Sequence, residues 1–472
     1  MSADRSLNAR GRYRALFPVV FALAWPTMLE ELMQTAVQYI DTAMVGQLGT
    51  DATAAVGSTT TVNWLIGTTV YAFGIGFLAL ISQALGAGER ERARKASAQS
   101  VLMVLLVGGL FTALTAGLSS FVPVWMQVEP ALRPLAARYF LIVYLPMLPR
   151  AASVIFGTVL RAAGDTKTPM RVGVGVNLLN VALNFLLIYQ SRTVSLFGLN
   201  FTAWGAGLGV TGAALASAVS FTVGGIAITA ALYRHPTVSP RGLSIRPDRA
   251  VLRPFMRVAL PNMAQRFTTS LGYVVFASMI NALGDVSTAA HTVANTVESA
   301  FCIPGYGMQA AAATLTGNAI GMRDRQRQKD LSALIILIEV AMMLVTGSLL
   351  FAFAPQMVRL FSQDDRVIAL GSTVLRMVAC SEPIYGISIV VEGMLQGAGK
   401  TRAPFVFNVI GMWGVRIFGT FLLIHWLGGG LVSAWGCMIA HNLLLCLLFA
   451  VYYRKLERTS FNGKDSHLSG VL

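Results

Sequence analysis

The sequence predicts an all-α membrane protein with twelve transmembrane helices, arranged as two six-helix lobes related by a pseudo-two-fold axis along the membrane normal. Three observations predict this fold: an apolar composition, twelve long apolar segments and an internal repeat. The 472 residues are 55% hydrophobic and only 12% charged, and the mean hydropathy is +0.64. Such a chain has too little polar surface to cover a soluble globule of its size, so we place it in a lipid bilayer.

Each apolar segment is long enough to cross the bilayer, which takes roughly 20 helical residues at about 1.5 Å per residue. In chain order the segments are Phe17 to Val45, Ala52 to Leu85, Ala96 to Val124, Ala136 to Val159, Pro169 to Tyr189, Val210 to Tyr233, Pro254 to Leu283, Thr288 to Ile320, Leu331 to Phe361, Ile368 to Leu395, Pro404 to Leu427 and Leu431 to Tyr453.

The chain repeats itself at an offset of 235 residues, so that Pro26 falls on Pro261 and Gly86 falls on Gly321. Each copy holds six spans, an even number, and both copies therefore enter the membrane from the same side as parallel lobes. We divide the chain accordingly into a cytoplasmic N-terminal segment, a first lobe, a basic cytoplasmic linker, a second lobe and a cytoplasmic tail. Their bounds are 1–16, 17–233, 234–253, 254–453 and 454–472.

Lys and Arg gather in every second connection between the spans, as at Arg90 to Lys95 and at Arg323 to Lys329, and both termini are basic as well. By the positive-inside rule these parts face the cytoplasm, so we expect a multi-pass protein of the bacterial inner or plasma membrane. The formal net charge of +15 is then a topology signal, and we expect no nucleic-acid partner. The longest outward connection, Gln190 to Gly209, is expected to cap one lobe without a site of its own.

A polar stripe follows one face of the first span. Glu30, Gln34, Gln38 and Asp41 have i, i+4, i+8 and i+11 spacing, and Glu31 lies beside them. A carboxylate in mid-bilayer costs roughly 2.5 to 3.5 kcal/mol, so intramembrane acids are usually functional. We interpret Asp41 as an ion-coupling group and the other polar residues of the stripe as lining a substrate cavity. The alternative is that Asp41 is a solvated cap at the outer helix end.

The fifth span supplies a partner for Asp41. Asn177, Asn180 and Asn184 recur at i, i+3 and i+7 on one face of an apolar segment. Their side-chain oxygens can bind a cation, and their amide groups can donate to a carboxylate. Thr211, at the start of the sixth span, adds a hydroxyl. Ordinary hydrogen bonding between helices is the alternative explanation.

The second copy carries different chemistry at the matching positions. Gln265, Arg266 and Thr269 replace Glu30, Glu31 and Gln34, while Phe276 replaces Asp41. Other polar residues of this copy are candidates for the substrate cavity, namely Tyr273, His291, Glu298, Glu382 and Glu392. A buried ion pair between one of these acids and Arg266 or Arg416 is the structural alternative.

Five segments together resemble the multidrug and toxic compound extrusion (MATE) transporters. Three lie in the first copy, at Tyr39 to Gly49, Gln83 to Arg94 and Leu160 to Pro169. The other two lie at the corresponding positions of the second copy, at Gly317 to Arg325 and Gly393 to Pro404. The resemblance covers the chain from about Pro26 to the end of the last span. It implies a V-shaped pair of six-helix lobes that exports mostly cationic or amphipathic compounds in exchange for Na⁺ or H⁺.

The same resemblance assigns the coupling carboxylate to Asp41 and the polar positions of the fifth helix to Asn180 and Asn184. Members with a well-formed cation site often have Asp where this chain has Asn184. The missing charge favours H⁺, because one desolvated carboxyl takes up a proton more readily than it strips a sodium ion of water. Another branch has Glu just after the proline motif of helix 7, where this chain has Gln265 to Thr269. The C-terminal site of that branch therefore does not transfer.

We thus expect an antiporter that exports small organic molecules, working as a monomer with H⁺ or Na⁺ as coupling ion. No catalytic cluster of His and carboxylates is visible, and the four cysteines have no metal-binding spacing, so we expect no enzyme, no cofactor and no structural metal. A flippase for lipid-linked saccharides is the alternative, because a cavity for such anions needs cationic residues. The intramembrane arginines that support this alternative are Arg150, Arg266, Arg376 and Arg416.

Overall fold

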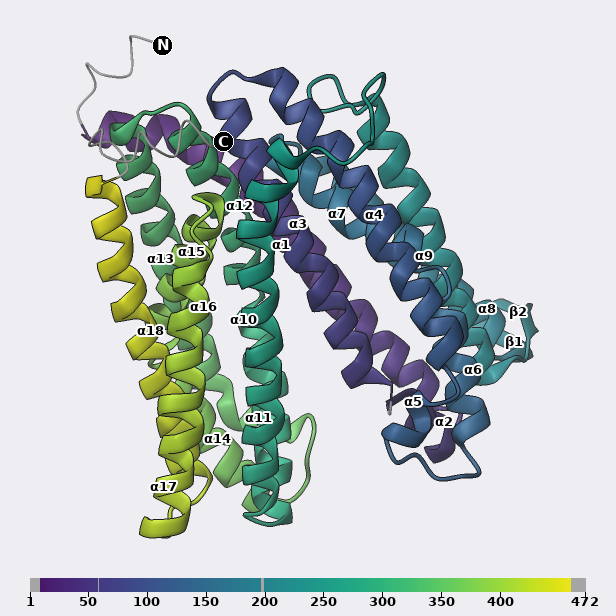
Figure 1. Ribbon diagram of the computed structural model, residues 1–472. Helices are drawn as coiled ribbons and strands as arrows, with labels where there is room; N and C mark the ends of the chain where they lie inside the picture. Colours follow the sequence, from purple (N-terminus) through teal and green to yellow (C-terminus); the bar gives the residue numbers. More distant parts are fainter. Residues whose placement is uncertain (1–8, 58, 197–198, 460–472) are drawn as a thin grey trace. The chain divides into compact units, whose positions relative to one another are not determined.

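The computed structural model describes residues 9–57, 59–196 and 199–459 of the chain, and most of them are helical (Figure 1). All twelve predicted spans are helical. Eight consist mainly of one helix, namely α1 (Ala9–Gly46), α3 (Thr60–Gly86), α4 (Arg90–Leu118), α8 (Lys167–Ile188), α9 (Gly209–Arg234), α10 (Arg249–Asn281), α13 (Arg325–Arg359) and α18 (Leu431–Thr459).

The other four spans are interrupted helices. They are α6 (Arg133–Tyr144) with α7 (Met147–Ala162), α11 (Asp285–Phe301) with α12 (Ile303–Gly321), α14 (Asp365–Ala379) with α15 (Glu382–Gly397), and α16 (Arg402–Val409) with the π-helical turn η2 (Ile410–Ile417) and α17 (Phe418–Leu427). Two short helices are separate from the long ones: α2 (Thr50–Gly57) lies at the start of the predicted span Ala52 to Leu85, and α5 (Val122–Trp125) lies at the end of the predicted span Ala96 to Val124.

Within the described chain, eight helices are long and apolar enough to cross a membrane, and two bent pairs bring the number to ten. The two remaining spans are α10 and the pair α11 and α12. Four arginines, Arg249, Arg253, Arg257 and Arg266, together with Gln, Thr, Ser and Asn residues, make α10 less apolar than the spans that qualify. Asp285, His291 and Glu298 have the same effect on α11.

The two bent pairs occupy the same place in the two copies of the repeat. Helices α6 and α7 meet at 48°, and α14 and α15 meet at 57°. The first break includes Pro146, and the second is followed by Pro383 in the first turn of α15. Proline has no backbone N–H to donate and disfavours a helical residue before it, so a helix ends there readily. Each copy therefore contains one span that is broken near its middle.

The predicted loop from Gln190 to Gly209 contains a hairpin that sequence analysis missed. Strands β1 (Gln190–Leu196) and β2 (Leu199–Ala206) pair antiparallel, with Gln190 opposite Ala206 and Leu196 opposite Leu199. The hairpin joins α8 to α9, and β2 packs against α8. We missed it because the segment was read only as a connection between two spans.

The chain folds into two compact units. Unit 1 comprises residues 1–28, 78–93 and 249–472, and unit 2 comprises residues 29–77 and 94–248. Unit 1 contains two large buried apolar clusters. One joins α12, α13, α15 and α18 with the start of α1, and the other joins α10, α11, α13, α14 and α18. The acids of the second copy lie on helices of these two clusters.

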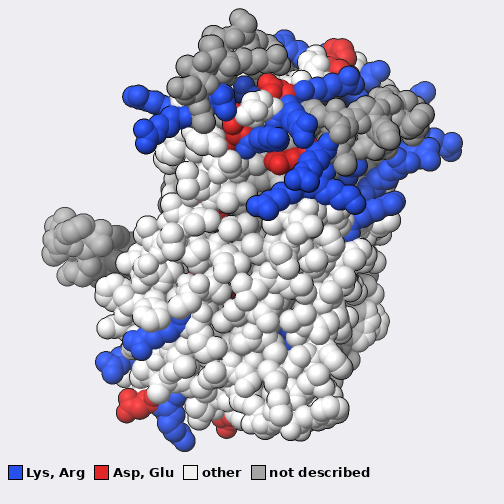
Figure 2. All heavy atoms as spheres, turned by 90° about the vertical axis from the view of Figure 1, so that its left-hand side faces the viewer, with Lys and Arg blue, Asp and Glu red and all other residues white. Residues whose placement is uncertain are grey.

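Figure 2 shows charged side chains gathered at the ends of the visible face, with a wide uncharged belt between them. Most of the Lys and Arg on this face lie at one end. Large apolar side chains of α13 and α18 are exposed, among them Leu337, Val345, Leu447 and Val451, each at least 60% exposed. An exposed apolar belt between charged ends is the surface that a bilayer requires, since lipid covers the belt and water covers the ends.

Candidate ion and substrate sites

Asp41 meets two asparagines of α8 inside unit 2. Asn184 donates from Nδ2 to Oδ1 of Asp41. The amide of Asn180 lies 2.9 Å from Oδ1 and 3.1 Å from Oδ2 of Asp41 when its nitrogen faces the acid. Asn180 is 6% exposed and Asn184 is 1% exposed. The asparagines are one helical turn apart on α8, which lets both reach one carboxylate near the end of α1.

The amide of Asn180 has two useful orientations. With its nitrogen turned away from Asp41, it donates to Oγ of Ser217 on α9 at 3.4 Å, and its oxygen accepts from Asn184 at 3.2 Å. Its oxygen then faces both oxygens of Asp41, which is favourable only if a proton or a cation lies between them. With its nitrogen turned toward Asp41, the amide instead donates to an ionised carboxylate. The two orientations therefore suit two charge states of Asp41.

The structure places the other residues predicted for this site outside the cluster. Asn177 and Thr211 are half-buried, and neither side chain hydrogen-bonds to another described residue. Ser217, which sequence analysis missed, takes the hydroxyl position that we expected for Thr211. It had no distinguishing sequence signal, because small residues are frequent along α9.

Glu30 is engaged in an ion pair. Arg161, in the last turn of α7, donates from Nη2 to both carboxylate oxygens of Glu30, at 2.6 and 2.7 Å. The two side chains are 17% and 16% exposed. We had counted Arg161 only as a topology charge, yet it ties α7 to α1. Of the other stripe residues, Gln34 and Gln38 are exposed without a side-chain hydrogen bond to a described residue, and Glu31 is half-buried.

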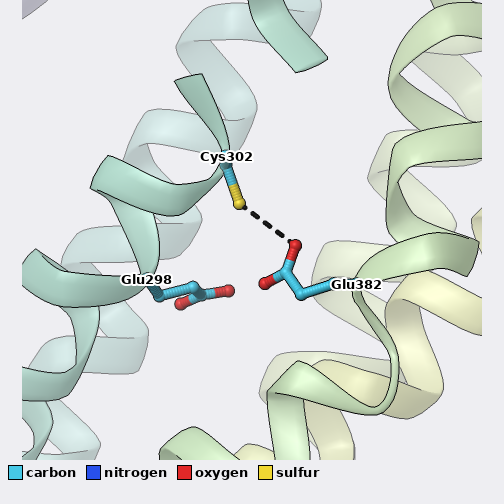
Figure 3. A group of neighbouring side chains, drawn as sticks. All are labelled: Glu298, Cys302 and Glu382. Carbon is cyan, nitrogen blue, oxygen red and sulfur yellow. Dashed lines mark hydrogen bonds between the residues drawn. The ribbon is translucent and has the colours of Figure 1, made fainter. Parts of the chain in front are cut away.

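Two acids of the second copy come together in unit 1 (Figure 3). Glu298 of α11 and Glu382 of α15 point toward each other, and the thiol of Cys302 donates to Oε2 of Glu382 at 3.4 Å. One ligand atom from each of the three residues lies within 4.8 Å of the others. Glu298 is 8% exposed and Glu382 is fully buried. We had expected Cys302 only to pack, because its sequence spacing carries no signal.

Glu339 of α13 adds a third acid that sequence analysis missed. It is fully buried, and neither of its carboxylate oxygens has a hydrogen-bond partner among the described residues. A Cβ atom at Gly305 would lie 2.7 Å from Oε1 of Glu339, and one at Gly386 would lie 2.9 Å from it. The two glycines thus make room for the acid. Its position inside the apolar span Leu331 to Phe361 was a signal that could have found it.

Buried carboxylates as close as those of Glu298 and Glu382 are stable only when bound protons or a bound cation reduce their charge. The ion pair with Arg416, which was the structural alternative, is not formed by any carboxylate of the described residues. Instead, the Arg416 guanidinium lies 4.2 Å from the ring centre of Phe276 and 4.9 Å from that of Tyr273. Such stacking partly compensates a cation removed from water.

The remaining candidates of the second copy lie in separate contacts. Gln265 donates to Oε1 of Glu392 at 2.8 Å, and Nε of Arg266 donates to Asn262 at 3.3 Å. His291 accepts at Nδ1 from the indole of Trp435 at 3.2 Å. Thr269 is half-buried and Tyr273 is 39% exposed. The structure thus distributes these residues over several contacts within unit 1.

The MatE family model matches residues 26–186 and 261–422, which is more than half of the chain. The chain belongs to the MatE family. The two matched segments begin 235 residues apart, at the offset of the internal repeat. MatE proteins are transporters, so this chain is a membrane transporter and not an enzyme.

Curated relatives match this MatE chain over most of its length. The probable multidrug resistance protein NorM of Thermotoga maritima is 26% identical over 91% of the chain and 90% of the relative. The multidrug resistance protein PmpM of Pseudomonas aeruginosa is 25% identical over 86% of the chain and 83% of the relative.

A solved outward-facing multidrug resistance MATE family transporter of the MOP superfamily matches with a TM-score of 0.86. The match is 22% identical and covers 94% of this chain and 96% of that one. This likeness confirms the predicted fold class of an all-α membrane protein.

Proposed function

We propose that this MatE protein is an antiporter that exports organic compounds, often cationic or amphipathic, in exchange for H⁺ or Na⁺. The proposal rests on one observation: the carboxylate of Asp41 lies within hydrogen-bonding distance of the side-chain amides of Asn180 and Asn184. The names of the relatives from Thermotoga maritima and Pseudomonas aeruginosa support multidrug compounds as the transported class.

The coupling step follows from the two orientations of Asn180. When Asp41 is ionised, both asparagines donate to it and hold α1 against α8. When Asp41 takes up a proton, it donates to the oxygen of Asn180, whose nitrogen then turns to Ser217 on α9. Proton uptake thereby reverses the hydrogen bond between Asp41 and Asn180 and adds a contact between α8 and α9. A ligand that favours one arrangement shifts the equilibrium between transport states.

We favour H⁺ over Na⁺ because a single carboxylate faces two neutral amides. Sodium needs several oxygen ligands to replace its water shell, and a second carboxylate at position 184 is absent. The distribution of Lys and Arg supports cytoplasmic termini in a bacterial inner membrane, which makes export the direction that an inward ion gradient drives.

The test is uptake of a fluorescent organic cation into inverted membrane vesicles, with pH and Na⁺ gradients imposed separately. Asp41→Asn keeps a similar shape but removes the titrating group, and we expect gradient-driven uptake to be lost. Asp51→Asn is the matched control, because Asp51 is an exposed acid of α2 in the same unit. Full pH-driven uptake by Asp41→Asn would contradict the coupling role. Transport of a lipid-linked saccharide but of no organic cation would favour the flippase alternative.

A further inference from the structure

An open recess of about 370 Å³ lies where α10 and α16 meet in unit 1. It is lined by Arg253, Met256, Arg257, Leu260, Pro261 and Arg402. On α10, the residues at 253, 257 and 260 have i, i+4 and i+7 spacing and share one helical face. The recess therefore combines three guanidinium groups with apolar side walls.

The frame of the recess is well packed. Thr401, which precedes α16, donates from Oγ1 to the backbone oxygen of Val258 on α10 at 2.7 Å. Phe255 is fully buried and Val258 is 6% exposed, so one face of α10 is anchored in the protein. The opposite face leaves Met256 at 39% and Leu260 at 50% exposed. The walls of the recess are thus held in place whether or not it is occupied.

The three arginines are exposed and lack an acidic partner. None of Arg253, Arg257 and Arg402 forms an ion pair with a carboxylate of the described residues. Three uncompensated cations around one recess create a positive potential that favours an anion. A guanidinium fits a phosphate especially well, because two of its N–H groups can bind two phosphate oxygens at once.

The apolar part of the recess indicates that the anion carries a hydrocarbon chain. Met256 and Leu260 lie further along α10 toward the predicted membrane interior than Arg253 does, and α10 follows directly on the basic linker. An anionic phospholipid meets both parts of this surface, with its phosphate against the arginines and an acyl chain along Met256 and Leu260. A free phosphate would use only the arginines. Basic pockets at the cytoplasmic ends of membrane helices are suited to such headgroups.

We propose that this recess is a binding site for the phosphate headgroup of an anionic phospholipid in the cytoplasmic leaflet. The internal repeat supports a dedicated site, because the positions matching Arg253 and Arg257 in the first copy are Pro18 and Ala22. Arg253 and Arg257 are therefore not shared by the two copies of the repeat. They belong to the second copy alone, and the proposed site does not depend on ion coupling at Asp41.

The test measures binding of phosphatidylglycerol to the purified full-length protein in a neutral detergent by native mass spectrometry. Each Arg near an anionic headgroup contributes roughly a factor of five, so we expect Arg253→Gln with Arg257→Gln to weaken binding about thirtyfold. Arg454→Gln is the control, because Arg454 is an exposed cation at the end of α18 and does not line the recess. It should bind the lipid as wild type does.

Further measurements separate the lipid from a free anion and from misfolding. Phosphatidylcholine should bind much more weakly than phosphatidylglycerol, and millimolar inorganic phosphate should not displace the lipid. Arg253→Lys with Arg257→Lys keeps the charge but loses the paired N–H groups, so it should bind more tightly than the glutamine variant and less tightly than wild type. Equal binding by the glutamine variant and wild type would overturn the proposal. Equal affinity for phosphatidylcholine, or displacement by phosphate, would overturn it as well.

Discussion

The two copies of the repeat place their buried polar groups at different positions of the same helical plan. In the first copy, Asp41, Asn180 and Asn184 form one cluster, and the matching residues of the second copy are Phe276, Val415 and Gly419. The second copy thus lacks all three groups. Phe276 instead lies under the Arg416 guanidinium, at 4.2 Å from the ring centre.

The reverse holds for the acids of the second copy. Glu298, Cys302, Glu339 and Glu382 match Asn63, Gly67, Val104 and Met147 of the first copy. Val104 and Met147 are buried apolar residues. The comparison teaches that duplication preserved the backbone, including the break before Met147 and before Glu382, while the charged sites diverged independently.

A third position shows the same helices joined by different chemistry. The Glu30 and Arg161 ion pair of the first copy corresponds to Gln265 and Gln396 in the second. Both glutamines donate to Oε1 of Glu392, at 2.8 and 3.1 Å. A direct ion pair in one copy is replaced by a carboxylate between two amides in the other.

The largest effect on transport is expected from giving the first copy a second carboxylate. Asn184→Asp adds a charged oxygen ligand beside Asp41, so Na⁺-driven uptake should rise about tenfold relative to pH-driven uptake, which corresponds to roughly 1.4 kcal/mol of added ion affinity. Vesicle uptake under separate gradients measures it. Asn177→Asp is the control, because Asn177 lies outside the cluster. An unchanged ion preference would show that position 184 does not select the ion.

The largest effect on stability is expected where Glu30 and Arg161 join α1 and α7. Glu30→Gln introduces the residue of the second copy and removes the carboxylate that accepts two hydrogen bonds from Arg161, so we expect a loss of about 2 kcal/mol in the free energy of unfolding. The double variant with Arg161→Gln should lose clearly less, because the guanidinium that lost this carboxylate is removed as well. Chemical unfolding in detergent micelles measures both. A double variant as unstable as the single one would mean that packing, not charge, joins α1 and α7.

A smaller effect should follow from filling the space beside Glu339. A methyl group at Gly386 would lie 2.6 Å from Cγ of Met343 and 2.9 Å from Oε1 of Glu339, so Gly386→Ala should destabilise the protein by about 1 to 2 kcal/mol through overpacking. At Gly109 of α4 a Cβ atom meets no other atom within 4 Å. Gly109→Ala should therefore be neutral or stabilising. Chemical unfolding in detergent micelles measures both glycine variants. Stability unaffected by Gly386→Ala would mean that Glu339 has room to move.

The smallest effect concerns the aromatic contact of the second copy. His291→Val introduces Val56, the matching residue of the first copy, and removes the acceptor of the Trp435 indole. Trp435 is fully buried, so the lost hydrogen bond should cost about 1 kcal/mol in the free energy of unfolding. His291→Asn, which can offer an oxygen to the indole, should recover part of the loss. Equal stability of His291→Val and wild type would show that this hydrogen bond makes no net contribution.

Sequence analysis was most successful where the signal lies within one helix. The apolar spans and the spacing of Glu30, Gln34, Gln38 and Asp41 follow from hydropathy and a 3.6-residue period, which are local properties. It was less successful for contacts between helices. Ser217 replaced Thr211 beside Asn180, and the hairpin in the loop after α8 was overlooked, because its strands depend on their pairing with each other.

The sequence alone determined that this chain spans a membrane, that it is built from two related halves and that Asp41 stands out in the first span. These conclusions need only composition, periodicity and repetition. Tertiary structure decided that Glu30 pairs with Arg161, that Glu298 and Glu382 face each other and that Arg416 stacks on aromatic rings. The reason is physical: the partner of a buried charge depends on which helix faces meet, and packing of the whole unit sets those faces.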